Sequence, residues 1–278
     1  MDANLNQDSQ GVKFAAVQMV SGTVVADNLA RAREWVAEAA AQGAQWVVLP
    51  EYFALMGQHD GDKVAVREVF GQGPMQETLA ELAQQHGIYL VGGTIPLDAG
   101  VSDKVWNSCL VFDPSGQCVS RYDKIHLFGF SGLGERYAEA DSIVAGHTRT
   151  VVEAPFGRVG LSVCYDLRFP ELFRGMGELA AIVLPAAFTA TTGEAHWEPL
   201  LRSRAIENQC YVIASAQGGL HQNGRRTHGH SMIIDPWGRI VAELPTGEGV
   251  VCADLSMTLT ESIRTRLPAL RHRVFKES

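Results

Sequence analysis

The two halves of the chain share the same order of short motifs, and this internal repeat constrains the fold more than any other feature. The motif V-L-P-x-x-F occurs at 48–53 and again at 183–188. A strand–turn–strand pattern with an Asp-Pro-x-Gly turn occurs at 110–119 and 232–241. Because proline presets φ in such a turn and glycine accepts a positive φ, each stretch predicts a β-hairpin. Two further strand-like pairs match: 13–20 with 157–166, and 87–94 with 210–217.

Helical patterns separate the predicted strands, with apolar residues at three- and four-residue spacing. They cover 28–43 and 74–87 in the first half, and 170–178 and 196–209 in the second. Each half therefore reads β-α-β-α-β-β. Two such halves predict two sheets packed face to face with helices outside, a four-layer α-β-β-α sandwich. No Ser/Gly-rich linker separates the halves, so we expect one domain over 1–278, with a core at about 13–254 and a C-terminal tail at 255–278.

Composition and charge narrow the possible partners. The formal net charge is −8, and the longest basic stretch, 264–273, is interpreted as a solvated tail, so nucleic-acid binding is not expected. No apolar run approaches the roughly 20 residues needed to span a bilayer, and the polar N-terminus does not resemble a signal peptide. The 5 cysteines are widely spaced without a C-x-x-C pair, which favours a reducing cytoplasm over a disulfide framework.

The repeat also shows where the halves differ, and three chemically active side chains have no counterpart. Glu51 corresponds to Ala186 in the second V-L-P motif. Cys164 and Lys124, which follow a strand and a hairpin, have no equivalent in the other half. All three lie at or just beyond strand ends, where α/β sheets place their ligands. We therefore expect these three residues to form one site.

The trio suits covalent catalysis. A carboxylate can take the proton of a thiol and later return it to a leaving amine, while an ammonium stabilises an oxyanion. A helix start near 168–170 would bring N–H groups close to the sulfur. Each residue alone is ordinary, since a lone cysteine at a strand end is more often an inert core thiol. His228 and His230 are not expected to bind a metal, because no carboxylate or cysteine at suitable spacing joins them.

Three motif blocks resemble those of the carbon–nitrogen hydrolases, the nitrilase superfamily: "LPEYF" (49–53), "YDKIHLF" (122–128) and "GLSVCYDLRFPELFR" (160–174). Two further stretches, 184–219 and 229–243, agree, and the similarity runs from about residue 13 to 254. The resemblance implies an α-β-β-α sandwich that forms homodimers or higher homo-oligomers. It implies no metal and no organic cofactor.

The resemblance also implies roles for individual residues. Glu51 would be the general base, Lys124 the oxyanion partner and Cys164 the nucleophile, with the backbone N–H of Tyr165 completing the oxyanion hole. The family's second glutamate aligns with Glu139, with Glu135 as the alternative. From their position after the second-half strand, we expect three residues to line the substrate pocket: Phe188, Thr189 and Trp197.

Within the superfamily, "CYDLRFPE" resembles the amidase branch that includes deaminated-glutathione amidase and ω-amidase. The expected reaction is hydrolysis of a small primary amide through a thioester with release of ammonia, and the expected substrate is deaminated glutathione. An ω-amidase acting on α-ketoglutaramate, a carbamoylase and a nitrilase remain alternatives on the same triad. A metabolite-binding protein without activity is the alternative outside enzymes. Gly129 and Ala140 depart from the family pattern in the loop that shapes the pocket, which leaves the substrate open.

Overall fold

The fold is built around two β-sheets, and a computed structural model describes it for residues 11–132 and 135–275. The first sheet has eight strands and the second has six. The first contains β1 (Val12–Gln18), β2 (Trp46–Val48), β3 (Tyr89–Val91), β4 (Ile95–Asp98), β5 (Val105–Phe112), β6 (Cys118–Asp123), β9 (Ile143–Val144) and β16 (Gly249–Leu255). The second contains β10 (Val151–Ala154), β11 (Gly157–Leu161), β12 (Ala181–Ala186), β13 (Tyr211–Ala216), β14 (Ser231–Ile234) and β15 (Ile240–Leu244).

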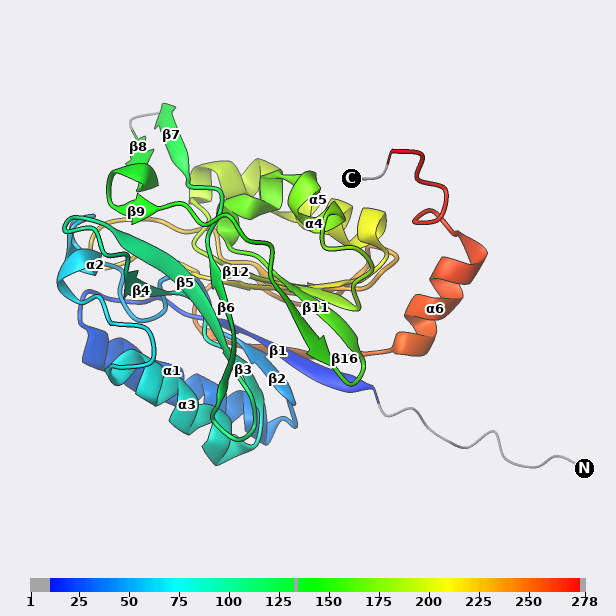
Figure 1. Cartoon of the computed structure of the whole chain (residues 1–278), viewed down its shortest axis with the longest axis horizontal. Helices are drawn as coiled ribbons and strands as arrows, with labels where there is room; N and C mark the ends of the chain where they lie inside the picture. The colour runs from blue at the N-terminus through cyan, green and yellow to red at the C-terminus, as the bar shows by residue number, and fades with distance from the viewer. Residues whose placement is uncertain (1–10, 133–134, 276–278) are drawn as a thin grey trace, which may run out of the picture.

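Helices cover the outer faces of both sheets, so the molecule has the four layers expected from the repeat (Figure 1). The first sheet carries α1 (Val25–Ala41) and α3 (Pro74–His86), and the second carries α4 (Pro170–Arg174) and α5 (Ala190–Asn208). The short elements are α2 (Asp62–Ala65), α6 (Met257–Arg266), the 3₁₀ turns η1 (Glu139–Asp141) and η2 (Cys164–Arg168), and the hairpin of β7 (Gly129–Gly132) and β8 (Glu135–Ala138).

The alternation of side chains along β1 shows how the layers are held together. Phe14 and Ala16 pack into the core that contains residues of both sheets, whereas Ala15 and Val17 pack with the apolar residues of α1 and α3. All four are fully buried. A strand that is covered on both faces needs apolar residues at every position, which is why β1 reads as a continuous apolar run.

The expected helix boundaries were partly wrong in the second half. The helix predicted at 170–178 ends at Arg174, since Gly177 takes a positive φ of 77°. The helix predicted at 196–209 begins earlier, at Ala190, because the Thr189 hydroxyl accepts the backbone N–H of Thr192 as an N-cap. The repeat also gave no sign of β16, which returns from the second half and pairs antiparallel with β1.

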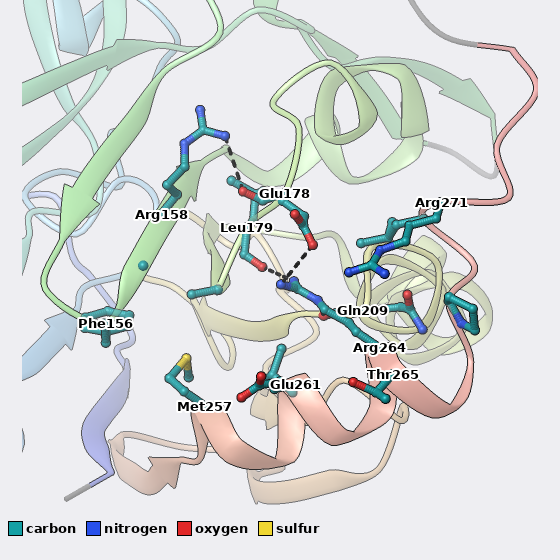
Figure 2. A pocket seen from close by; sticks show the side chains of 15 residues that line it. Phe156, Arg158, Glu178, Leu179, Gln209, Met257, Glu261, Arg264, Thr265 and Arg271 are labelled. Carbon is teal, nitrogen blue, oxygen red and sulfur yellow. Dashed lines mark hydrogen bonds and ion pairs between the residues drawn. The ribbon is translucent and has the colours of Figure 1, made fainter. Parts of the chain in front are cut away.

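Part of the basic stretch at 264–273 is not solvated, contrary to expectation. Arg264 on α6 donates to the carbonyls of Leu179 (2.5 Å) and Gln209 (3.1 Å), and lies 3.5 Å from the carboxylate of Glu178 (Figure 2). These contacts hold α6 over a groove of about 1080 Å³, whose lining shares no residue with the Glu51, Lys124 and Cys164 trio. No helix within 11–132 or 135–275 is long and apolar enough to cross a membrane.

Candidate active site

Glu51, Lys124 and Cys164 converge on one point between the two sheets. Glu51 follows β2, Lys124 directly follows β6, and Cys164 opens η2 just after β11. The side chains of Lys124 and Glu51 are almost completely buried, at 0% and 1% exposure. The first half therefore supplies the two charged groups and the second half supplies the sulfur.

Lys124 lies between two carboxylates. Its Nζ is 2.9 Å from Oε1 of Glu51, and 2.9 Å and 2.7 Å from Oε1 and Oε2 of Glu139. One ammonium against two carboxylates leaves the cluster with a net charge of −1 when all three groups are ionised. Of the two glutamates considered from the sequence, Glu139 is the one that contacts Lys124, while the side chain of Glu135 lies outside the described residues.

Additional donors fix the orientation of both carboxylates. Glu139 accepts the hydroxyl of Tyr52 (2.8 Å) and the backbone N–H of Phe128 (2.7 Å). Glu51 accepts the side-chain amide of Asn107 (3.0 Å) and the backbone N–H of Ala187 (2.9 Å). Because buried carboxylates are costly without such donors, these contacts hold each group in one rotamer.

Cys164 lies beside Glu51 and close to Ala187, whose backbone N–H donates to Glu51. Burial, followed by the charge of Glu51, raises the pKa of the Cys164 thiol well above its usual value. Burial also raises the pKa of the Glu51 carboxyl, and the Lys124 ammonium only partly opposes this. The resting sulfur is therefore protonated, with a carboxylate of raised basicity beside it.

The two groups on the other side of the cluster are shifted towards their charged forms. Burial opposes the charge on Glu139, but the Lys124 ammonium and the donors around the carboxylate hold its pKa below the usual value. Burial likewise opposes the charge on Lys124, but Glu139 and Glu51 outweigh it and raise the pKa of the ammonium. Lys124 thus remains a cation and is no proton donor for the chemistry.

Cys164 adopts an unusual backbone conformation, with a φ of +48°. This left-handed conformation is uncommon outside glycine and here turns the chain sharply from β11 into η2. Asp166, which is fully buried, closes the turn by accepting the backbone N–H of Val163 (2.8 Å) and the hydroxyl of Tyr122 (2.7 Å). It also accepts the backbone N–H of His126 (3.1 Å), which ties the Cys164 turn to the loop that carries Lys124.

A small cavity opens beside the sulfur. Its lining comprises Phe128, Cys164, Tyr165, Ala187, Phe188, Thr189 and Thr192. Phe188 and Thr189 thus lie where the sequence placed them, and so does Tyr165. Trp197 does not line this cavity, because it is fully buried behind Phe188, at 5.0 Å between ring centroids, and donates its indole N–H to the carbonyl of His230.

The sequence patterns did not indicate five residues of the site: Tyr52, Asn107, Phe128, Ala187 and Thr192. Asn107 was detectable as a polar residue inside the apolar run of β5, and Tyr52 directly follows Glu51. As for a metal, no group of three or more His, Cys, Asp or Glu side chains within the described ranges could hold one. The rings of His228 and His230 stack on each other at 4.5 Å, and His230 contacts Glu243 at 2.6 Å.

Comparison with known proteins assigns this arrangement to a family. The sequence model of the family described as Carbon-nitrogen hydrolase matches residues 13–265. The chain belongs to the carbon–nitrogen hydrolase family. This confirms the resemblance seen in the three motif blocks, and the chain is an enzyme of the class that acts on carbon–nitrogen bonds of amides.

Within the family, this carbon–nitrogen hydrolase is similar to two amidases and to one solved structure. It is 42% identical to the deaminated glutathione amidase of Synechocystis sp. (strain PCC 6803 / GT-S), covering 94% of this chain and 97% of that protein. It is 37% identical to omega-amidase NIT2 of Danio rerio, covering 94% of both chains. The crystal structure of Saccharomyces cerevisiae Nit3, a member of branch 10 of the nitrilase superfamily, superposes with a TM-score of 0.86 at 33% identity, covering 96% of this chain and 98% of that one. The layered sandwich is therefore the family fold.

Proposed function

We propose that Cys164 hydrolyses an amide C–N bond through a thioester, with Glu51 as the general base and Lys124 on the oxyanion. The observation that carries this proposal is the buried ion pair of Lys124 with Glu51 (2.9 Å), beside which Cys164 lies. A thiol is a weak nucleophile at neutral pH unless a base is in reach, and here the base is adjacent.

The steps follow from the positions of the groups. Glu51 takes the thiol proton as the sulfur attacks the amide carbonyl, and the oxyanion is stabilised by Lys124 and the backbone N–H of Tyr165 at the start of η2. Collapse of this intermediate breaks the C–N bond, and Glu51 gives its proton to the leaving nitrogen. Glu51 then takes a proton from water, which attacks the thioester carbonyl. The carboxylic acid leaves, and the sulfur regains its proton.

The 2-oxoglutaryl group is the acyl group we propose. Deaminated glutathione joins this group to cysteinylglycine, and α-ketoglutaramate joins it to ammonia, so both substrates give the same thioester. Relatives named for each substrate align over nearly the whole chain, and the higher identity is to the deaminated glutathione amidase, which we take as the main function. Deaminated glutathione contains no primary amide. The sequence-based expectation of ammonia as the leaving group is therefore wrong for this substrate, and the leaving group is an amine.

The test follows 2-oxoglutarate released from deaminated glutathione and α-ketoglutaramate with glutamate dehydrogenase and added ammonium. Ammonia released from a carbamoyl amino acid or a nitrile is followed with the same dehydrogenase and added 2-oxoglutarate. Deaminated glutathione, α-ketoglutaramate, a carbamoyl amino acid and a nitrile are compared at matched concentrations. We expect the highest kcat/KM with deaminated glutathione. Higher turnover of another compound would keep the triad and replace the substrate, and no turnover of any compound would favour a metabolite-binding protein.

The matched control for the nucleophile is a second buried cysteine. Cys164→Ala is expected to remove all hydrolysis, while Cys210→Ala, at a fully buried position of the second half, should keep it. Full activity of Cys164→Ala in a folded protein would contradict the mechanism.

We further propose that the chain acts without a cofactor, as a homodimer or larger homo-oligomer in the cytoplasm. Its 5 cysteines are all free, which fits a reducing compartment. Light scattering of the purified protein measures the assembly, and a monomeric mass would contradict it.

A further inference from the structure

A second small cavity borders the catalytic cluster beyond the ring of Tyr52. Tyr52 links the two regions, because its hydroxyl donates to Glu139 while its ring lines this cavity. The mechanism above does not use the other polar groups here. The lining comprises Tyr52, Leu55, Met56, Gly57, His59, Asp60, Lys63 and Arg225.

Lys63 is one of two cations in this cavity, and its ammonium has one hydrogen-bond acceptor and one distant carboxylate. Its side chain is 15% exposed, and its Nζ lies 5.6 Å from the centre of the Tyr52 ring. It donates to the hydroxyl of Ser142 (3.2 Å) and lies 3.8 Å from the carboxylate of Asp60, which is 72% exposed. Lysine is rarely buried without a close anion. Burial lowers the pKa of its ammonium, which an anionic ligand would reverse.

Arg225 is the other cation, and the loop that carries it is held in place. Its backbone N–H donates to the side chain of Asn223 (3.0 Å), and its carbonyl accepts the N–H of His221 (2.9 Å). The guanidinium lies 5.2 Å from the centre of the Tyr137 ring. Arg225 forms no ion pair with any carboxylate within residues 11–132 and 135–275.

A row of aromatic rings connects this cation with the sulfur. Phe128 lines the Cys164 cavity, and its ring is 5.4 Å from that of Tyr137, on which Arg225 lies. A short apolar chain bound along these rings would have one end at the sulfur and the other near the guanidinium. The ion cluster beside the sulfur is net negative, and a guanidinium near that cavity, that of Arg168, lies over the Phe188 ring (5.2 Å). At the far end, Lys63 and Arg225 outnumber Asp60.

We propose that Lys63 and Arg225 bind a carboxylate on the acyl group of the substrate, so that the amide carbonyl reaches Cys164. This inference rests on the proposed function for the hydrolysis, and it adds the two residues that recognise the far carboxylate of the acyl group. Guanidinium groups bind carboxylates through two parallel hydrogen bonds, and the remaining lone pairs of the carboxylate oxygens can accept a hydrogen bond from the lysine ammonium. The negative cluster at the sulfur repels the same carboxylate and so sets the orientation.

The test compares two amides that differ only at the far end: glutaramate, which carries a terminal carboxylate, and pentanamide, which ends in a methyl group. For the wild type we expect kcat/KM to be higher for glutaramate. Arg225→Gln should lower kcat/KM for glutaramate roughly 10- to 100-fold, mainly through KM, and leave pentanamide nearly unchanged. Lys63→Met should act in the same direction, and Arg225→Lys should restore part of the loss.

Arg226 provides the matched control, because it is the next residue in the same loop and its side chain is exposed. Arg226→Gln should leave both amides unchanged. Equal losses for the two amides in Arg225→Gln, or an equal effect of Arg226→Gln, would overturn the proposal.

A binding measurement separates this inference from the proposed function. Cys164→Ala cannot form the thioester, so its affinity for glutaramate and pentanamide reports recognition alone, by calorimetry or ligand-observed NMR. We expect tighter binding of glutaramate, lost when Arg225→Gln is added. If the wild type hydrolyses neither these amides nor deaminated glutathione but this preference is present, the proposed function fails and the carboxylate site stands. If the preference is absent, the carboxylate site is refuted whatever the enzyme hydrolyses.

Discussion

In the proposed mechanism Glu51 carries out the proton transfers, so the ionisation of this one side chain should set the acid limit of the reaction. Below its pKa, Glu51 is protonated and cannot accept the thiol proton. Since burial raises this pKa and the charge of Glu139 raises it further, we expect kcat/KM to fall at a higher pH than an ordinary glutamate would give. A pH profile of kcat/KM measures this limit directly.

Glu139→Gln tests the cause of the shift. Removing the negative charge removes one contribution that raises the pKa of Glu51, so the acid limb of the profile should move to lower pH. An unchanged or higher midpoint in this variant would show that the pKa of Glu51 is set without Glu139.

Lys124 also contributes to stability, because it neutralises two buried carboxylates. Lys124→Met leaves Glu51 and Glu139 facing each other, and we expect a loss of about 3–5 kcal/mol in the free energy of unfolding at neutral pH. The double variant Lys124→Met/Glu139→Gln should recover part of this loss. Chemical unfolding at fixed pH measures both values.

Lys124→Met should also invert the way in which the free energy of unfolding depends on pH. In the wild type, Glu139 has a lowered pKa in the folded state, so its contribution to stability is lost as pH falls. Without Lys124, burial raises the pKa of Glu139, so protonation favours the folded state and stability should increase as pH falls. A variant that still loses stability in acid would contradict this account of the cluster.

At the scale of elements, the loops that follow β2 and β3 pack directly on one another. Gly93 has a φ of +54°. A Cβ at this position would lie 2.1 Å from the carbonyl oxygen of Pro50, the residue before Glu51, and would clash with it. Gly93→Ala should therefore move the Glu51 loop and reduce both stability and kcat.

The substitution Gly87→Ala is the control that separates the effect of this steric clash from the effect of backbone strain. Gly87 ends α3 with a similar φ of +63°, and a Cβ there meets nothing within 4 Å. Gly87→Ala should cost only the strain of about 1–2 kcal/mol and leave kcat unchanged. Thermal unfolding and steady-state kinetics are measured for Gly93→Ala and Gly87→Ala. If both variants change kcat equally, the contact of Gly93 with Pro50 does not position the Glu51 loop.

The sequence was most informative where one local rule decides the outcome. Helices α1 and α3 were predictable because their apolar periodicity is long and each is followed by a glycine. The repeat isolated Glu51, Lys124 and Cys164 because a scaffold position has a counterpart and these do not. The positive φ of Cys164, the burial of Trp197 and the strand β16 were not predictable, since contacts distant in the sequence determine them.

At the scale of the molecule, the site joins the halves of the repeat, since Glu51 and Lys124 come from the first sheet and Cys164 from the second. Strand β16 crosses back to pair with β1 along its whole length. We therefore propose that the chain is a single domain and expect one cooperative unfolding transition, with activity and circular dichroism lost together. A folded half that persists after activity is lost would contradict this.

The single lysine between two carboxylates has a consequence for what happens after hydrolysis. The substrate amide is neutral at its reacting end, but the product acid ionises there, next to a cluster whose net charge is −1. Repulsion at this end then weakens the binding of the product, so we expect the acid to leave readily and to bind less tightly than the amide.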